Sequence, residues 1–366
     1  MDHIAERAEK LSRLRRLLAE AHLDAIWLRR MSSFAWLTAG AADYVSIADE
    51  HGIASILVTP QRAIIATNNI EAPRLRAEEG LDDAGFEWHV SPWHEPADVL
   101  SAWAAGQSVG CDEAFPGTTN LAGAISALRS QLLPAETERM RDVGRRCGQA
   151  MDATLEAIEP GMSEMDIAGL LAANAYTQGV VPIVNLVAAD ARTADYRHPI
   201  PTERRLQRYV MVVLSGRRYG LIAALTRFVH FGPLPKDLRV RAEAVAHVDA
   251  TFIANTRPGR RLADIFQAGV EAYAAAGYRK EWLHHHQGGT AGYEGREEKA
   301  RPASTSIVYQ GQAYAWNPSI AGAKSEDTIL VGAADNEVIT VTLHVPTLVV
   351  RVGDRNYMRP AIWERV

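Results

Sequence analysis

Three short segments in the C-terminal part of this chain constrain its fold more than any other feature of the sequence. The first, His284–Glu297, combines three consecutive histidines with a glycine-rich loop and an Arg-Glu pair. The second is Trp316–Ile320 and the third is Lys324–Val331. The glycines give the loop the conformational freedom that tight turns require. We therefore expect the loop that follows the histidines to turn tightly.

The order and spacing of these segments resemble the C-terminal half of the creatinase, prolidase and aminopeptidase P family (peptidase family M24). The resemblance extends over nearly the whole chain. It implies an α/β (α+β) fold with a creatinase-like α/β domain at residues 1–133 and a domain of the pita-bread fold at residues 134–366. It also implies a homodimer, in which residues around Arg29–Phe34 contribute to the partner's site.

The composition argues against several classes of function. The chain has 366 residues, 47% of them apolar, which is long enough for about two domains. A formal charge of −5 gives no electrostatic reason to bind nucleic acid or an anionic membrane. Two cysteines, Cys111 and Cys147, are too few for a disulfide framework. No apolar run approaches the roughly 20 residues that span a bilayer and no signal peptide is evident, so we expect a cytoplasmic protein.

Alternating helices and strands support an α/β interpretation of the first domain. Apolar residues recur with helical spacing across residues 4–22. Short apolar runs bounded by turn residues predict strands. The predicted strands are Ala25–Leu28, Ala54–Thr59, Arg62–Thr67 and Val109–Asp112. The segment Ser33–Gly40 resembles a turn of the same family.

The second domain is expected to open with a long helix after Leu133. This helix ends before Pro160-Gly161, because both residues break helices. Ser163 and Asp166 have the spacing of a capping pair at the start of the next helix. The other predicted elements are the two strands of a hairpin and two helices, at Val210–Leu214, Ala223–Val229, 236–256 and 261–276.

The resemblance points to a metal site that has lost most of its ligands. Metallopeptidases of the family hold two divalent ions with two Asp, one His and two Glu. The corresponding residues here are Val213 or Ser215, Ala224, Gly289, Asn317 and Glu326. One carboxylate cannot hold two hard cations. The sequence therefore predicts no metal and no other cofactor, and it argues against a conventional prolidase or aminopeptidase P.

Two histidines are the candidate catalytic residues. His198 corresponds to the histidine that supplies acid–base catalysis in creatinase, which works without metal, and an imidazole suits proton transfer to a leaving amine. The alternative is a histidine hydrogen-bonded to loop backbone. His285 corresponds to a site histidine that binds no metal, and we expect it to face the substrate. If His284, His285 and His286 lie on a strand, at most two of them can face one pocket.

Further residues are expected to bind the substrate. Arg296 can clamp a carboxylate with two hydrogen bonds. It can instead form an internal ion pair with Glu294 or Glu326. The candidate substrate-binding residues are Arg296, Asn317, Glu326, Tyr293 and His286.

Three functional interpretations remain open. The first is a metal-independent hydrolase or lyase of the creatinase type, acting on a small nitrogen-containing substrate. The second is a non-catalytic pseudopeptidase that binds a small molecule or a short peptide. The third is a mononuclear metal hydrolase whose ligands have moved to His198, to His285 or His286, and to Glu326. The fold alone does not choose among them.

Overall fold

The structure, a computed structural model, describes residues 3–95 and 98–365, and it divides into two compact units. Unit 1 comprises Met1–Glu136 and Tyr219–Leu221, and unit 2 comprises Thr137–Arg218 and Ile222–Val366. Within the described residues, no helix combines the length and the apolar character that crossing a membrane requires. Cys111 and Cys147 are both buried free thiols.

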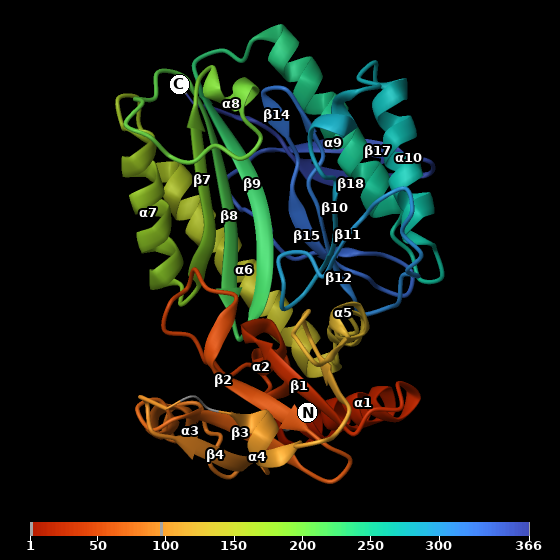
Figure 1. Cartoon of the computed structure of the whole chain (residues 1–366). Coiled ribbons are helices and arrows are strands. Elements are labelled where there is room, and N and C mark those ends of the chain that lie inside the picture. Colours follow the sequence, from red (N-terminus) through yellow and green to blue (C-terminus); the bar gives the residue numbers. More distant parts are fainter. Residues whose placement is uncertain (1–2, 96–97, 366) are drawn as a thin grey trace. The chain divides into compact units, whose positions relative to one another are not determined.

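Unit 1 is built on a six-stranded mixed sheet with the strand order β4-β3-β2-β1-β5-β6 (Figure 1). The strands are β1 (Ala25–Arg30), β2 (His51–Val58), β3 (Ala63–Asn68), β4 (Glu87–Ser91), β5 (Val109–Cys111) and β6 (Thr119–Asn120). The helices are α1 (His3–Glu20), α2 (Met31–Leu37), α3 (Ala72–Ala77), α4 (Val99–Trp103) and α5 (Ala122–Arg129). All four predicted strands are confirmed. The segment Ser33–Gly40 is mainly helix α2, and the turn follows at Ala39 and Gly40, where φ is 64° and 111°.

The first half of unit 2 contains a four-stranded sheet with the order β19-β9-β8-β7. Its strands are β7 (Val181–Ala189), β8 (Tyr209–Arg218), β9 (Leu221–Phe231) and β19 (Trp363–Arg365). The helices of this half are α6 (Pro134–Ala157), α7 (Glu164–Thr177) and α8 (Arg192–Asp195). The predicted capping pair is confirmed, because Asp166 N donates to Ser163 Oγ at 3.0 Å and Ser163 N donates to Asp166 Oδ2 at 2.8 Å. The predicted hairpin is β8 and β9.

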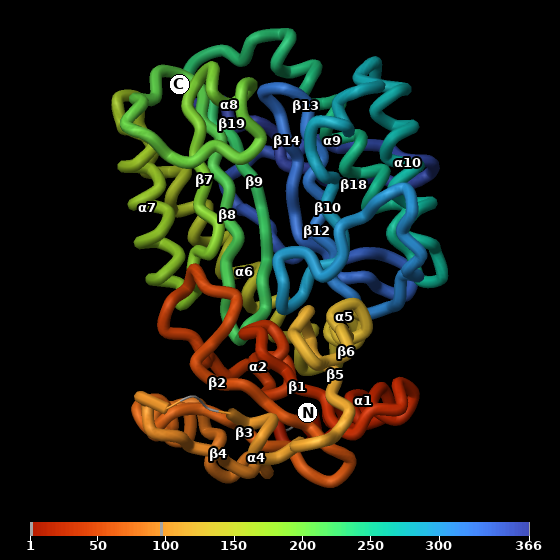
Figure 2. The backbone as a smooth tube through the Cα atoms, viewed as in Figure 1, coloured from red at the N-terminus to blue at the C-terminus, as the bar shows by residue number. Residues whose placement is uncertain are grey.

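The second half of unit 2 contains a five-stranded antiparallel sheet with the order β11-β10-β12-β15-β16. Its strands are β10 (Gly288–Ala291), β11 (Glu298–Lys299), β12 (Ala313–Trp316), β15 (Asp327–Leu330) and β16 (Glu337–Val338). Two hairpins join β13 (Ser319–Ile320) to β14 (Ala323–Lys324) and β17 (Thr347–Val352) to β18 (Arg355–Pro360). Figure 2 follows the chain from the hairpin into α9 (Lys236–Asn255), α10 (Leu262–Ala275) and the blue strands beyond.

Apolar packing fixes α9 on this second sheet, and α10 contributes residues to the same buried cluster. Phe252 of α9 stacks on Trp316 of β12 with ring centroids 4.5 Å apart, and Tyr314 stacks on the same indole at 5.7 Å. Each aromatic residue is fully or almost fully buried, and burying such a side chain contributes about 1.5–3 kcal/mol. The helices therefore hold β12 and its neighbours in place.

The two sheets of unit 2 meet along β9 and the start of β15. Thr226 N donates to Glu326 O at 3.2 Å. Ala224 N donates to Thr328 Oγ1 at 2.8 Å, and the Thr328 hydroxyl donates to Ala224 O at 3.0 Å. This junction carries the polar groups of the candidate site.

Candidate active site

Three histidines from two segments form one cluster in unit 2. His198 lies in the loop between α8 and β8, and His285 and His286 lie between the 3-10 turn η1 (Glu281–His284) and β10. One ring nitrogen of each histidine lies within 4.8 Å of the other two. The Nε2 atoms of His198 and His285 are 3.1 Å apart. The structure thus brings both predicted catalytic residues together.

The three consecutive histidines do not lie on a strand. His284 ends η1 and is exposed, whereas His285 is extended, with φ of −156°. β10 begins only at Gly288. His285 and His286 still reach one cluster with His198, because the change from turn to extended backbone separates His284 from the other two.

Hydrogen bonds define the protonation of the His198–His285 pair. The Nδ1 atom of His285 lies 3.2 Å from Asn317 O, and since a carbonyl oxygen only accepts, His285 Nδ1 carries the hydrogen. A neutral imidazole has one N–H, so His285 Nε2 accepts from His198 Nε2. The lone pair of a neutral His198 is then on Nδ1.

Glu326 is held by three side chains at once. Lys324 Nζ donates to its Oε2 at 2.7 Å, and Thr226 Oγ1 donates to the same oxygen at 2.6 Å. Arg296 Nη2 donates to Oε1 at 3.0 Å. Of the predicted alternatives for Arg296, the structure contains the internal ion pair with Glu326. The side chains of Lys324 and Glu326 are only 5% and 4% exposed, so water does little to screen this pair.

The surrounding charges shift the pKa values of the site. Burial alone would raise the pKa of Glu326, but the charges of Lys324 and Arg296 outweigh it and keep that pKa far below its ordinary range. Burial, with Lys324 as the next cause, lowers the pKa of His285 to about 2. Burial and the charge of Arg296 lower the pKa of His286 to about 3. The pKa of His198, which is exposed on one side, is lowered by partial burial and then by Lys324. All three imidazoles are therefore neutral at pH 7.

The other predicted binding residues occupy different positions around this centre. Asn317 contributes its backbone carbonyl to His285, while its buried side-chain Oδ1 has no partner within the described residues. His286 Nδ1 and Arg296 Nε are also buried and without a partner in the described part of the chain. Tyr293 is buried, with 2% of its surface exposed, and its backbone N–H donates to Glu297.

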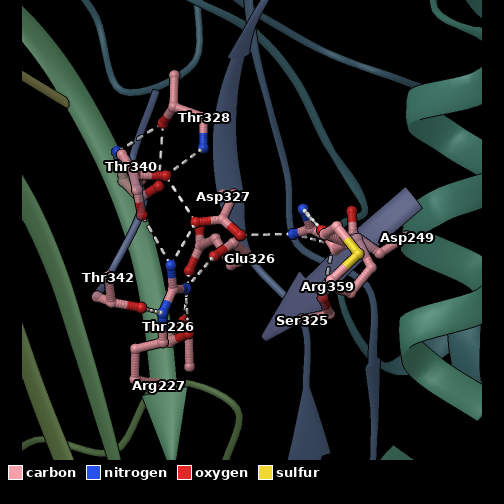
Figure 3. A network of polar contacts seen from close by, with 12 residues as sticks. Thr226, Arg227, Asp249, Ser325, Glu326, Asp327, Thr328, Thr340, Thr342 and Arg359 are labelled. Carbon is pink, nitrogen blue, oxygen red and sulfur yellow. Dashed lines mark hydrogen bonds and ion pairs between the residues drawn. The ribbon is translucent and has the colours of Figure 1, made fainter. Parts of the chain in front are cut away.

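A buried network on the opposite side of β15 supports the site (Figure 3). Arg227 donates to Asp327 Oδ1 at 2.7 Å and to Thr342 Oγ1 at 2.8 Å. Arg359 donates to Asp327 Oδ2 at 2.6 Å and to Asp249 Oδ2 at 2.9 Å. Because successive residues of an extended chain point to opposite sides, Asp327 anchors the segment while Glu326 faces the histidines.

Lys324 is the site residue that sequence reasoning missed. The available signal was proximity in the sequence, since Lys324 stands two positions before Glu326. What the sequence could not give is the direction of the side chain. The structure turns the ammonium group toward Glu326.

Two sequence profiles match the chain. The profile described as "Metallopeptidase family M24" matches residues 138–333. The chain belongs to metallopeptidase family M24. The profile described as "Creatinase/Prolidase N-terminal domain" matches residues 10–143. The α/β fold with these two domains is therefore confirmed. No curated protein matches the sequence significantly.

Solved structures agree with this fold assignment. The prolidase from Pyrococcus horikoshii OT3 is similar with a TM-score of 0.78 and 17% identity, over 92% of this chain and 99% of that chain. The Xaa-Pro dipeptidase from Bacillus anthracis has a TM-score of 0.76 and 20% identity, over 92% and 98%. The N-terminal domain of the FACT complex subunit SPT16 from Cicer arietinum (chickpea) has a TM-score of 0.68 and 13% identity, over 92% and 96%. At such identities the likeness concerns the fold.

Proposed function

We propose that this M24 family member is a metal-independent hydrolase that cleaves a C–N bond in a small nitrogen-containing substrate, with His198 as the proton-transfer residue. The observation that carries the proposal is the binding of Glu326 by Lys324 at 2.7 Å and Arg296 at 3.0 Å, next to the hydrogen-bonded histidine pair. The chain's own cations thus neutralise the one carboxylate that corresponds to a family metal ligand.

The donor set around Glu326 does not fit the two ions of the family's peptidases. A Cβ atom at Gly289 would lie 1.9 Å from Glu298 O, so the backbone leaves no room for a histidine at this position. Ala224 offers only a methyl group, and the Asn317 side chain offers no charge. Two divalent ions beside Lys324 and Arg296 would meet uncompensated repulsion. We therefore assign no reaction step to a metal.

The histidine pair supplies acid–base chemistry of the kind that C–N hydrolysis requires. In the proposed step, His198 Nδ1 takes a proton from water while the water oxygen forms a bond to the substrate carbon. His198 then passes this proton to the nitrogen as the C–N bond breaks, and it returns to its neutral state. His285, oriented by Asn317 O, holds His198 Nε2 and so directs Nδ1 as the base.

The charge balance of the site favours a substrate with a negatively charged group. Glu326 carries one negative charge, whereas Lys324 and Arg296 carry two positive charges and the histidines are neutral. The Nε–H of Arg296 is buried and has no acceptor among the described residues, although two other atoms of the guanidinium are bonded. A carboxylate on the substrate would satisfy this donor.

The test is hydrolysis by tag-free protein in the presence of EDTA. Creatine, N-carbamoylglycine, N-acetylglycine and Gly-Pro are suitable probes, with the released amine or urea as the readout. We expect one of the non-peptide probes to be hydrolysed with EDTA present, and His198→Ala to lower kcat by about 100-fold or more. His284→Ala, which changes an exposed histidine outside the cluster, is the matched control. Turnover that requires Mn²⁺ or Co²⁺ would contradict the proposal.

A binding protein without turnover is the second candidate. Its support is that a similar fold occurs in the N-terminal domain of the FACT complex subunit SPT16 from Cicer arietinum. If a probe raises the melting temperature while none is hydrolysed, the pocket binds without catalysis and this second candidate replaces the first.

A further inference from the structure

We infer that His198, His285 and His286 form a binding site for one zinc-type divalent ion, and that the bound ion inhibits the enzyme by occupying the catalytic histidine. The inhibition rests on the proposed function, whereas the binding does not. The proposed set consists of three imidazoles and differs both from the carboxylate-rich site of the family and from a set that includes Glu326.

The spacing of the imidazole nitrogens supports this assignment. Two zinc–nitrogen bonds of about 2.0–2.1 Å at a tetrahedral angle separate the two nitrogens by about 3.4 Å. The Nε2 atoms of His198 and His285 are 3.1 Å apart, and all three candidate atoms lie within 4.8 Å of one another. Only His286 has to move toward the pair. Its Nδ1 has no partner within the described residues, so this movement breaks no hydrogen bond at that atom.

A hydrogen bond to the backbone orients the His285 ring for metal binding. Histidines that bind metal usually donate their second N–H to a carbonyl or a carboxylate, which fixes the ring and exposes the other nitrogen. His285 Nδ1 has this contact, at 3.2 Å from Asn317 O, and its Nε2 lone pair faces the cluster. His198 is exposed, so an ion can reach the cluster from solvent.

Metal binding changes the tautomer of His198. In the free protein, His198 Nε2 carries the hydrogen and Nδ1 carries the lone pair. An ion bound at Nε2 requires a lone pair there, which moves the hydrogen of a neutral ring to Nδ1. The atom that would accept the proton from water is then no longer a base, so occupancy by metal and hydrolysis exclude each other.

The ligand chemistry determines which ions bind. The cluster offers imidazole nitrogens, which suit Zn²⁺ and Co²⁺. Among the described residues it offers no free carboxylate, because Glu326 is bound by Lys324 and Arg296. Hard ions such as Mg²⁺ and Mn²⁺ therefore lack their preferred oxygen ligands. The positive charges of Lys324, Arg296 and Lys299, which act on these histidines, weaken binding and make it reversible.

The binding experiment uses full-length, tag-free protein that has been treated with EDTA and dialysed. Titration with ZnCl₂ in a calorimeter gives the stoichiometry, and titration with CoCl₂ gives visible absorption bands of tetrahedral cobalt. We expect one ion per chain, and at least about tenfold weaker binding in His286→Gln. The matched control, His284→Gln, should bind as the wild type does. No binding up to 1 mM, or loss of binding in the control instead, would overturn the site.

Turnover measured in the same titration separates this inference from the proposed function. Zinc binding with a parallel loss of EDTA-resistant turnover supports both. EDTA-resistant turnover without zinc binding refutes the site and leaves the proposed function in place. Zinc binding that increases turnover supports the site, and it refutes both the inhibition and the metal-independent mechanism.

Discussion

At the scale of single residues, Lys324 stabilises the buried carboxylate of Glu326. Its side chain is 5% exposed, and its ammonium group donates to Glu326 at 2.7 Å. We expect Lys324→Met to lower the free energy of unfolding by about 2–3 kcal/mol, because a hydrogen bond to a buried carboxylate is lost while Arg296 and Thr226 remain. Urea denaturation measures this loss. Lys299→Met, at an exposed lysine, should cost less than about 0.5 kcal/mol, and an equal effect in both variants would show that no such pair forms.

His286 should make the stability depend on pH. Burial lowers its pKa in the folded protein to about 3, whereas an unfolded histidine titrates near 6.5. Because the unfolded chain binds the proton first, stability is complete above pH 6.5 and falls as the pH decreases toward 3. At pH 5 the wild type should have lost about 2 kcal/mol more than His286→Gln.

The measurement is the difference between the two unfolding free energies at pH 7.5 and at pH 5, with EDTA present. Comparison of two otherwise identical proteins cancels the contribution of Asp249, whose pKa burial raises to about 6. A difference that stays constant with pH would mean that His286 is protonated as easily in the folded protein as in the unfolded chain.

For single residues, the sequence could predict which residues belong to the site but not where their side chains point. The motif spacing identified His198 and His285, and the structure brings them within 3.1 Å of each other. It could not predict that Asn317 would act through its backbone carbonyl, since any residue at that position has one. Nor could it predict the orientation of Lys324, which depends on the short hairpin β13–β14 and on the ion pair itself.

At the scale of elements, a buried ion-pair network anchors the start of β15 on the side of the strand that faces away from the histidines. Arg359 of β18 forms ion pairs with Asp327, the first residue of β15, and with Asp249 of α9. All three side chains are almost fully buried. We expect Arg359→Met to lower the unfolding free energy by about 3–5 kcal/mol, because it leaves two buried carboxylates without their shared partner. Arg351→Met changes a side chain that is 74% exposed and is the control.

Thermal or urea denaturation distinguishes the two variants. The double variant Arg359→Met with Asp249→Leu should recover part of the loss, since one unpaired carboxylate is then removed. A loss below 1 kcal/mol in Arg359→Met would contradict an anchoring role for this network.

The elements that follow local rules were predictable, and those that depend on distant contacts were not. The Ser163–Asp166 capping box and the helix that ends before Pro160 follow from residue types alone. The 3-10 turn at Glu281–His284 has no such signal, and its neighbour Gln287 is held by Tyr273 and by backbone carbonyls. Tertiary contacts therefore set the backbone around the three histidines.

At the scale of the whole molecule, the order of short motifs in the sequence predicted the fold. These motifs contain side chains that form hydrogen bonds with residues far away in the chain. Thr226-Arg227 and Glu326-Asp327 are about 100 residues apart in the chain, yet they share hydrogen bonds across the junction of the two sheets. Such paired requirements restrict the topology more strongly than composition does. The function is harder to predict from these motifs, because the same fold can carry different side chains at its site.

The proposed function also predicts how the stability of the whole protein responds to metal. A protein that binds a dinuclear cluster gains about 2.7 kcal/mol of stability at a ligand concentration of 100 times Kd, so chelation lowers its melting temperature by several degrees. For protein dialysed free of zinc, we expect EDTA to leave the melting temperature unchanged and 1 mM MnCl₂ to raise it by less than about 1 °C, because Lys324 and Arg296 already neutralise Glu326. Differential scanning calorimetry on protein prepared without chelator measures both. A decrease of several degrees on chelation, together with two ions per chain by mass spectrometry, would mean that the family's metal site is intact and that the proposed mechanism is wrong.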